Sequence, residues 1–186
     1  MHKKTDEQIA AQVQKGDIES FGFLMKRYEE KMMRYGRRFI TNGEDIKDLV
    51  QEIFIKAYMN IKSFDPERRF SPWIYRIAHN EFVNAVKKRW REKVFPFDLD
   101  LLFPSPVAKE TADSEAHRKD IKRMLDKSLE KISAKYREPL ILYYFEEMNY
   151  KEIAEILQIP VSTVGIRLKR GKEILKEIVK KFDPIL

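Results

Sequence analysis

The sequence predicts an all-α protein with two small helical domains joined by an acidic, proline-containing linker. Apolar residues recur at helical spacing through most of the 186 residues, before and after a central segment. That segment, residues 95–117, interrupts the periodicity with three prolines and five acidic residues. Only six glycines occur in the chain, and 36% of its residues are charged, as in helices with solvated faces. We therefore expect a first domain over residues 1–94, a linker over 95–117 and a second domain over 118–186.

Charge is distributed unevenly along the chain, whose net charge is +7. Residues 1–94 contain 20 Lys and Arg against 14 Asp and Glu, residues 95–117 contain 1 against 5, and residues 118–186 contain 16 against 11. Two basic lobes therefore flank an acidic middle segment. This distribution favours a polyanionic partner.

Cysteine is absent from the chain, which excludes disulfide and thiolate chemistry and permits a reducing compartment. The first residues lack an apolar core of signal-peptide length. The longest apolar run, LILYYF at 140–145, is far shorter than a membrane span. We expect a soluble, intracellular protein with no direct membrane association.

The first two helices are expected within residues 6–40, where apolar residues recur at helical spacing. The stretch Lys15–Gly16–Asp17 separates them, and either Asp17 or Ser20 can cap the second helix. Their expected core residues are Ile9, Val13, Phe21, Leu24, Met25, Tyr28, Met32 and Phe39.

A third, acidic helix is predicted over residues 44–61, after a turn at Asn42–Gly43. It begins EDIKDLVQEIFIKAY, and its acidic residues occupy the first turns, where the helix dipole favours them. Its expected buried stripe consists of Leu49, Val50, Ile53, Phe54, Ala57 and Tyr58.

A fourth helix is expected after the turn Phe64–Asp65–Pro66. It should begin near Ser71, with Pro72 at its first position, and end near Trp90. Its last turns are rich in Lys and Arg, which suit a helix C-terminus and can be plain capping residues.

The block 63–93 combines aromatic and basic residues in a way that suits unstacked bases. The aromatics at positions 64, 70, 73 and 75 offer rings on which bases can stack, and the basic residues can hold phosphates. Asn80 and Asn84 lie one turn apart and carry amides able to read a base edge. A plainer interpretation places Trp73 and Tyr75 in the core.

The second domain begins where helical periodicity returns, at residue 118. Pro139 either follows a helix start near Glu138 or kinks a longer helix. The expected apolar positions before it are Ile121, Leu125, Leu129 and Ile132.

A helix-turn-helix is predicted over residues 149–177. Asn149 can cap its first helix with Glu152 three residues later, and Ser162 is the expected cap of the second. The exposed face of the second helix then carries three or four cations, which suits the major groove and its phosphate walls. An ordinary amphipathic helix pair with a basic face is the alternative. The expected core residues are Ile153, Ala154, Leu157, Val164, Leu168 and Leu175.

Three motifs, in this order, resemble a bacterial sigma factor of the sigma-70 family. They are EDIKDLVQEIFIKAY, SFDPERRFSPWIYRIAHN and NYKEIAEILQIPVSTVGIRLKRGK. The lack of other family regions indicates the short extracytoplasmic-function (ECF) group. The resemblance covers nearly the whole chain except the linker. It implies that the first domain is the region-two helical bundle and the second the region-four helix-turn-helix.

The resemblance also implies partners and site residues. The third helix would dock on the clamp helices of the largest subunit of core RNA polymerase, and a further contact would involve the polymerase flap. The residues implied for clamp docking are Asp45, Asp48, Gln51 and Glu52. The residues implied in recognising and melting the minus-ten promoter element are Phe64, Arg69, Phe70, Trp73, Arg76, Asn80, Asn84, Lys87, Lys88 and Arg89.

The second helix of the helix-turn-helix would read the minus-thirty-five element. Gly165 and Ile166 depart from the family pattern, which usually has polar or basic residues there, so the promoter sequence stays open. Such factors are usually sequestered by an anti-sigma protein in the bacterial cytoplasm. The residues implied in minus-thirty-five recognition are Ser162, Thr163, Ile166, Arg167, Lys169 and Arg170.

An enzyme is not expected, because the sequence offers no catalytic constellation, metal ligand set or cofactor loop. The three histidines are scattered, and no phosphate-cradling glycine motif is present. The rival interpretation is a stand-alone helix-turn-helix regulator whose N-terminal half only dimerises. Association with core RNA polymerase distinguishes the two.

Overall fold

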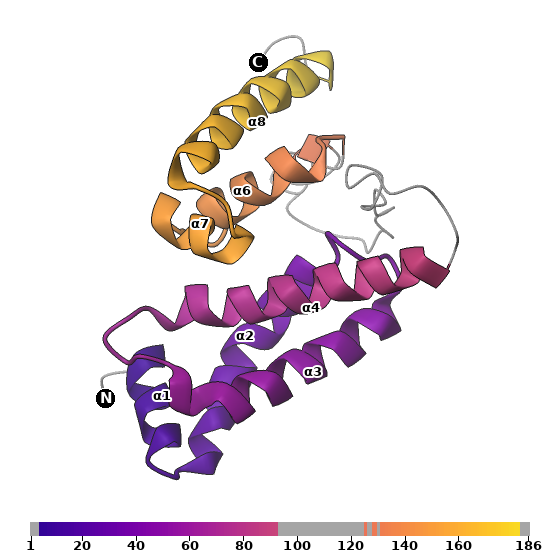
Figure 1. The fold of residues 1–186 in the computed structure, drawn as a ribbon. Helices are drawn as coiled ribbons and strands as arrows, with labels where there is room; N and C mark the ends of the chain where they lie inside the picture. Colours follow the sequence, from indigo (N-terminus) through magenta and orange to yellow (C-terminus); the bar gives the residue numbers. More distant parts are fainter. Residues whose placement is uncertain (1–3, 93–124, 126–127, 130, 183–186) are drawn as a thin grey trace, which may run out of the picture. The chain divides into compact units, whose positions relative to one another are not determined.

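The computed structural model describes residues 4–92, 125, 128–129 and 131–182, and within these residues every regular element is a helix (Figure 1). The all-α prediction is therefore confirmed. The helices form two compact units, the first containing α1–α4 and the second containing α6, α8 and most of α7. None of the described helices is both long enough and apolar enough to cross a membrane. The predicted linker, residues 95–117, lies outside the described residues.

The first unit begins with α1 (Asp6–Gln14) and α2 (Phe21–Gly36), as the interruption between them predicts. Gly16 adopts a φ of 103°, a conformation that a residue with a Cβ rarely adopts, so this glycine makes the break. Asp17 then caps the short 3₁₀ turn η1 (Ile18–Ser20) by accepting from the Ser20 N–H. The Ser20 hydroxyl also donates to the Asp17 carboxylate, at 2.6 Å, and the hydroxyl and N–H hydrogen bonds together lower the pKa of the Asp17 carboxyl.

The acidic helix α3 (Gly43–Asn60) begins after Asn42, whose side chain accepts a hydrogen bond from the Glu44 N–H at 3.0 Å. The prediction of buried positions is wrong at three residues of the first unit. Met25 is 40% exposed, Tyr58 is 37% exposed and Leu49 is half-buried. The buried stripe of α3 consists of Ile46, Val50, Ile53, Phe54 and Ala57.

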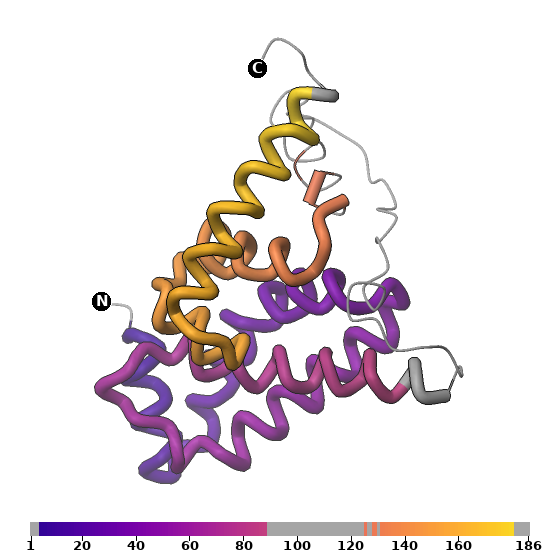
Figure 2. The backbone as a smooth tube through the Cα atoms, turned by 45° about the horizontal axis from the view of Figure 1, so that its top comes forward, coloured from indigo at the N-terminus to yellow at the C-terminus, as the bar shows by residue number. Residues whose placement is uncertain are grey.

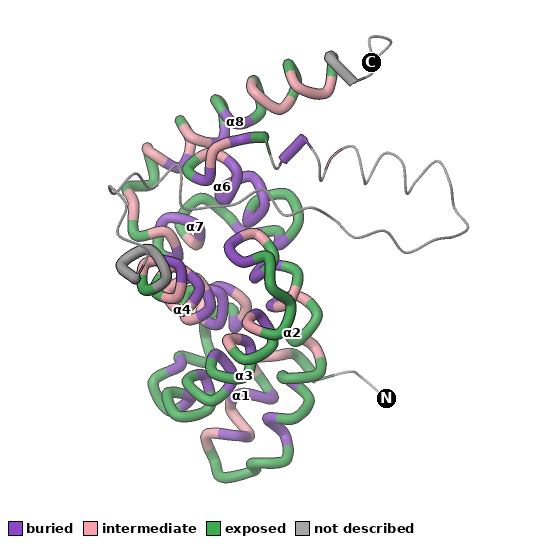
Figure 3. Tube along the Cα trace, turned by 90° about the vertical axis from the view of Figure 1, so that its right-hand side faces the viewer, coloured by how far each residue is buried: buried purple, intermediate pink, exposed green. Residues whose placement is uncertain are grey.

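The last helix of this unit, α4 (Phe70–Glu92), begins at Phe70, one residue before the predicted start. Pro72 is consequently the third residue of the helix, still in the first turn, where backbone N–H groups have no partner within the helix. Helices α3 and α4 pack alongside each other, as the tube in Figure 2 shows. Figure 3 shows buried residues on the inward sides of the helices and exposed residues on the outward sides.

Gly36, the last residue of α2, allows α2 to approach α4 closely. A Cβ atom there would lie 2.6 Å from Cζ of Phe82 and 2.8 Å from Cγ2 of Ile46. Phe82 stacks on Phe39 with 5.4 Å between ring centroids. This contact fixes the rotation of α4 about its axis, because Phe82 lies in the middle of that helix.

The second unit contains α6 (Ala134–Tyr144), most of α7 (Tyr150–Leu157) and α8 (Val161–Phe182). Pro139 lies inside α6, which starts at Ala134, so of the two alternatives the structure has the proline within a longer helix and not a helix start near Glu138. Before α6, residues 125, 128 and 129 are helical, and the expected position Ile121 lies outside the described residues.

The helix-turn-helix is formed by α7 and α8. Asn149 and Glu152 form the predicted reciprocal cap, with the Asn149 Oδ1 accepting from the Glu152 N–H at 3.0 Å and the Glu152 Oε2 from the Asn149 N–H at 2.8 Å. Gln158 turns the chain in the left-handed conformation, with φ 54°. The sequence predicts Ser162 as the cap of α8. That prediction is wrong, because the preceding residue, Val161, is already helical.

Candidate functional site

The exposed side of α3 carries the predicted docking residues. Asp48, Gln51 and Glu52 are exposed, whereas Asp45 is half-buried. Lys47 pairs with Glu44 at 2.9 Å, and this contact raises the pKa of the Lys47 ammonium. We call Asp45, Asp48, Gln51 and Glu52 the acidic face.

Two apolar residues that the sequence reasoning missed extend the acidic face along α3. Ile55 is 58% exposed and Met59 is 74% exposed. Asp48, Glu52, Ile55 and Met59 are spaced by four, three and four residues, which places them on one side of the helix. The signal was available in the sequence, because neither residue falls on the buried stripe. A surface that combines carboxylates and large apolar side chains suits a protein partner.

The turn between α3 and α4 is exposed, and its two ends are held from α1. Residues 65–69 are all exposed. Gln14 Nε2 donates to the carbonyl oxygens of Ile61 and Phe64, both at 2.7 Å. Glu7 Oε1 accepts from the Phe70 N–H at 3.0 Å. No local sequence signal reveals these contacts, because they join residues 47 to 63 positions apart.

Three of the aromatics expected to stack on bases are core residues instead. Phe64 is 3% exposed, and Phe70 and Tyr75 are fully buried, so in this structure their rings are covered and do not offer the stacking surface that the sequence predicts. Phe64 lies 5.2 Å from the Phe70 ring and 5.4 Å from Trp73. The physical reason is the helical period, since Phe70, Ile74, Ala78 and Phe82 form the core side of α4. Trp73 is half-buried and keeps part of its surface accessible.

Opposite this core side, α4 carries a row of residues that we call the polar stripe: Trp73, Arg76, Asn80, Asn84 and Lys87. Their spacing of three, four, four and three residues places them on one side of the helix. Arg76 and Asn84 are exposed, and Asn80 and Lys87 are half-buried.

Other predicted minus-ten residues lie beside the polar stripe. Arg69 is exposed in the turn before α4, and Lys88 is exposed near the end of the helix. The side chain of Arg89 lies outside the described residues. Glu81 forms an ion pair with Lys56 of α3, which ties the middle of α4 to its neighbour. His79 points to the core edge, 3.3 Å from the Tyr35 hydroxyl.

In the second unit, the predicted minus-thirty-five residues lie on the first turns of α8. Four of them are exposed, Ser162, Ile166, Lys169 and Arg170, and Ile166 is 56% exposed. Thr163 and Arg167 are half-buried. The four exposed residues fall on the side of α8 opposite its buried residues Val164, Leu168 and Gly171, whereas Thr163 and Arg167 flank the buried side. The helix therefore presents a basic surface with one apolar side chain.

Aromatic residues gather at the end of α6 and the start of α7. Tyr143, Tyr144, Phe145 and Tyr150 are between 37% and 51% exposed. The ring of Tyr143 lies 4.9 Å from Tyr144 and 5.5 Å from Tyr150. Among the described residues, no group of three or more His, Cys, Asp or Glu residues is arranged to hold a metal ion.

Two family models match the chain, one in each predicted domain. The family models Sigma-70 region 2 and Sigma-70, region 4 match residues 24–92 and 122–175. The ECF RNA polymerase sigma factor SigW from Bacillus subtilis (strain 168) is 33% identical over 172 residues, which cover 89% of this chain and 92% of SigW. The ECF RNA polymerase sigma-E factor from Haemophilus influenzae is 33% identical over 194 residues, covering 98% of this chain and 97% of that protein.

Solved structures share the fold. The sigma factor RpoE in complex with the anti-sigma factor NepR from Bartonella quintana has a TM-score of 0.67 and 23% identity, and the match covers 86% of this chain and 96% of that one. CnrH in complex with the cytosolic domain of CnrY has a TM-score of 0.66 and 24% identity, and the match covers 96% of this chain and 99% of that one. Because both region models match in order and the two aligned sigma factors span nearly the whole sequence, this chain belongs to the ECF RNA polymerase sigma factors of the sigma-70 family.

Proposed function

We propose that this chain is a transcription initiation factor that binds core RNA polymerase and directs it to specific promoters. The observation that carries the proposal is the arrangement of α3 and α4, which pack together in one bundle. One helix exposes carboxylates and apolar groups suited to a protein, and the other exposes an aromatic, amide and cationic row suited to DNA. The factor makes no covalent bond itself and acts where the polymerase is, in the bacterial cytoplasm.

The acidic face is the proposed docking site for the clamp helices of the largest polymerase subunit. Its carboxylates can pair with basic groups of the clamp and fix the register, while Ile55 and Met59 add apolar area. The exposed aromatic patch at Tyr143, Tyr144 and Phe145 is the proposed contact for the polymerase flap. Its support is the combination of exposure and ring size, since aromatic anchors are enriched at interfaces.

The polar stripe is the proposed minus-ten surface. Trp73 offers a partly accessible ring, Asn80 and Asn84 offer base-reading amides, and Arg76 and Lys87 lie in the same row to hold phosphates. Stacking and hydrogen bonding of an extruded base offset the few kcal/mol that unpairing costs. Arg69, Lys88 and Arg89 are further proposed phosphate contacts.

The first turns of α8 are the proposed minus-thirty-five reader. Arg167 and Arg170 can contact guanine edges or phosphates, and the exposed side chain of Ile166 can contact a thymine methyl group. Ser162, Thr163 and Lys169 complete the proposed contact surface. We place the working boundaries of the two domains at residues 1–94 and 118–186, with 95–117 as the linker.

An anti-sigma protein is a further proposed partner. The support is the RpoE structure of the same fold, which was solved with the anti-sigma factor NepR. The alternative, a stand-alone regulator with a dimerising N-terminal half, leaves the Sigma-70 region 2 match at residues 24–92 unexplained.

Core RNA polymerase tests the proposal. The purified chain should co-elute with core enzyme as a one-to-one complex. Run-off transcription from a library with randomised promoter sequence should then yield transcripts that start downstream of two shared sequence elements. Transcripts identical with and without the chain would contradict the proposal. Sequence-specific DNA binding without polymerase association would favour the stand-alone regulator.

A further inference from the structure

Helix α1 lies before the segment that matches the Sigma-70 region 2 model, which begins at residue 24. It nevertheless contacts the part of the chain that leads into α4. Gln14 is half-buried and donates from Nε2 to two carbonyl oxygens, those of Ile61 and Phe64, both at 2.7 Å. One side chain of α1 therefore fixes the point at which the exposed turn 65–69 leaves the bundle.

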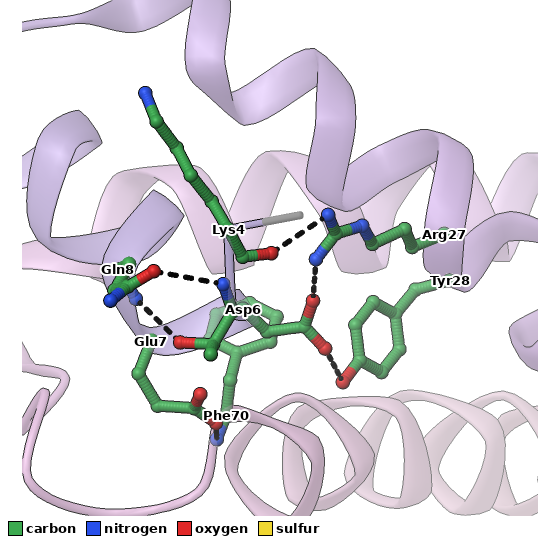
Figure 4. Close-up of polar contacts among 8 residues, drawn as sticks. Lys4, Asp6, Glu7, Gln8, Arg27, Tyr28 and Phe70 are labelled. Atoms are coloured by element: carbon green, nitrogen blue, oxygen red, sulfur yellow. Dashed lines mark hydrogen bonds and ion pairs between the residues drawn. The ribbon is translucent and has the colours of Figure 1, made fainter. Parts of the chain in front are cut away.

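Glu7 fixes the other end of the same turn. Its Oε1 accepts from the N–H of Phe70, the first residue of α4, at 3.0 Å (Figure 4). The first N–H groups of a helix have no partner inside the helix, and a carboxylate at this end is favoured by the helix dipole. Glu7 thus acts as a cap for α4 supplied from another helix, which accounts for the start of α4 at Phe70.

Helix α1 is itself fastened to α2. The Asp6 carboxylate forms an ion pair with Arg27 and accepts a hydrogen bond from the Tyr28 hydroxyl at 2.7 Å, both drawn in Figure 4. Arg27 also donates to the Lys4 carbonyl oxygen at 2.9 Å. Asp6 and Glu7 are neighbours in sequence, so adjacent carboxylates join α1 to α2 and to α4.

The exposed turn also has contacts within itself. Asp65 accepts from the Glu67 N–H at 3.0 Å and its side chain lies 3.9 Å from Arg68, and both contacts are internal to the turn. All five residues of the turn are exposed, whereas Phe64 and Phe70 at its two ends are buried. Both ends of the turn are held by α1, Phe64 through its carbonyl oxygen and Phe70 through its N–H.

We infer that Glu7 and Gln14 are positioning residues for promoter opening, because they hold the turn 65–69 and the first turn of α4 where Arg69, Trp73 and Arg76 meet the separated strands. The inference rests on the proposed minus-ten role of α4. Neither residue contacts DNA or polymerase in this scheme. Loss of either contact should slow strand opening while polymerase binding stays intact.

Variants of the full chain, assembled with core RNA polymerase, test the inference. E7A removes the acceptor for the Phe70 N–H, whereas E7Q keeps an amide oxygen in its place. Q14E keeps the shape of glutamine and removes both N–H donors. E19A removes an exposed carboxylate of η1 and is the matched control. Each variant is assayed for core binding, for thermal unfolding and for permanganate reactivity of unpaired minus-ten thymines on a promoter from the selected library.

We expect the rate of promoter opening to fall while the affinity for core enzyme is unchanged. E7A should slow promoter opening about tenfold, since one hydrogen bond contributes roughly the free energy of a tenfold change in an equilibrium constant. Q14E, which loses two hydrogen bonds, should slow it at least as much. E7Q should restore most of the rate, E19A should match the wild type, and affinity for core enzyme should stay within about twofold in all four.

Two results would overturn the inference. One is wild-type opening rates for both E7A and Q14E. The other is a parallel loss of polymerase affinity and opening, including in E7Q, which would indicate a general structural defect. If E7A does not fold, Q14E and E7Q decide the question. A wild-type chain that binds core enzyme but opens no promoter would instead refute the proposed function, and the inference with it.

Discussion

Two glycines of α2 should respond to alanine substitution in opposite directions. Gly22 is exposed in the first turn, and a Cβ there meets nothing within 4 Å. Replacing it should stabilise the first unit by about 0.5–1 kcal/mol, because alanine loses less conformational entropy in a helix. Alanine at position 36 has the same advantage in helix propensity, but its methyl group would overlap two neighbouring side chains.

The overlap at Gly36 is severe. The Cβ would lie 2.6 Å from Phe82 Cζ and 2.8 Å from Ile46 Cγ2, and both neighbours are at most 1% exposed, so neither can move into solvent. Overpacking of this kind costs about 1–3 kcal/mol, and the gain in helix preference offsets only part of it. We expect a net destabilisation of about 1–2 kcal/mol, or a fall in Tm of roughly 4–16 °C for a domain of this size. G22A should raise Tm by roughly 2–8 °C.

Tryptophan fluorescence isolates the relevant unit, because both tryptophans of the chain, Trp73 and Trp90, lie on α4. Thermal unfolding of the full chain followed at this signal should therefore place G22A above and G36A below the wild type. Because Phe82 lies between Asn80 and Asn84, G36A should also reduce promoter opening at temperatures where it is folded. Equal stability of G36A and wild type would refute the packing argument.

Three further predictions concern the docking face, the upstream reader and pH. D48R should weaken binding to core RNA polymerase at least roughly 100-fold, since like charges placed across an interface cost several kcal/mol; E29R, at an exposed site on α2, is the control, and unchanged co-elution of D48R would count against the docking role. R170A should weaken binding to the upstream element by about 1–3 kcal/mol if Arg170 contacts a guanine, whereas an equal loss on every sequence would make it a phosphate contact. Burial and the hydrogen bond to Asp6 raise the pKa of Tyr28 well above its ordinary value of 10.0, so the unfolded chain ionises first and stability should fall as pH rises above about 10. Y28F should show a smaller fall than the wild type in urea unfolding, and identical slopes would contradict this assignment.

Local rules predicted most of the helices. The reciprocal cap of α7 needs only Asn149 and Glu152, three residues apart, and the break between α1 and α2 needs only Gly16 and its neighbours. Such features depend on nearby residues, so they can be read from the chain. The same reasoning failed at Ser162, because a good capping residue does not prevent the preceding Val161 from adopting helical geometry.

The sequence predicted less well which aromatic residues lie in the core and which lie on the surface. An aromatic and basic block suggested several rings for base stacking, yet Phe64, Phe70 and Tyr75 are buried. Composition identifies which side chains are available, whereas the rotation of α4 is set by contacts with α2 and α3 that only the fold provides. The helical spacing of the buried residues of α4 could have placed Phe70 in the core. Phe64 precedes the helix, so no such spacing predicts its burial. The roles of the remaining site residues stay predictions.

The Gln14 amide holds carbonyl oxygens of the main chain and no side chain of the turn. The contacts of Gln14 that position the turn therefore do not depend on which side chains the turn carries. Residues 65–69 can be exchanged as a cassette while the frame that carries them is preserved, so a library randomised at these five positions should yield mostly folded, polymerase-binding proteins. Such a library offers a route to factors with altered promoter preference on an unchanged scaffold.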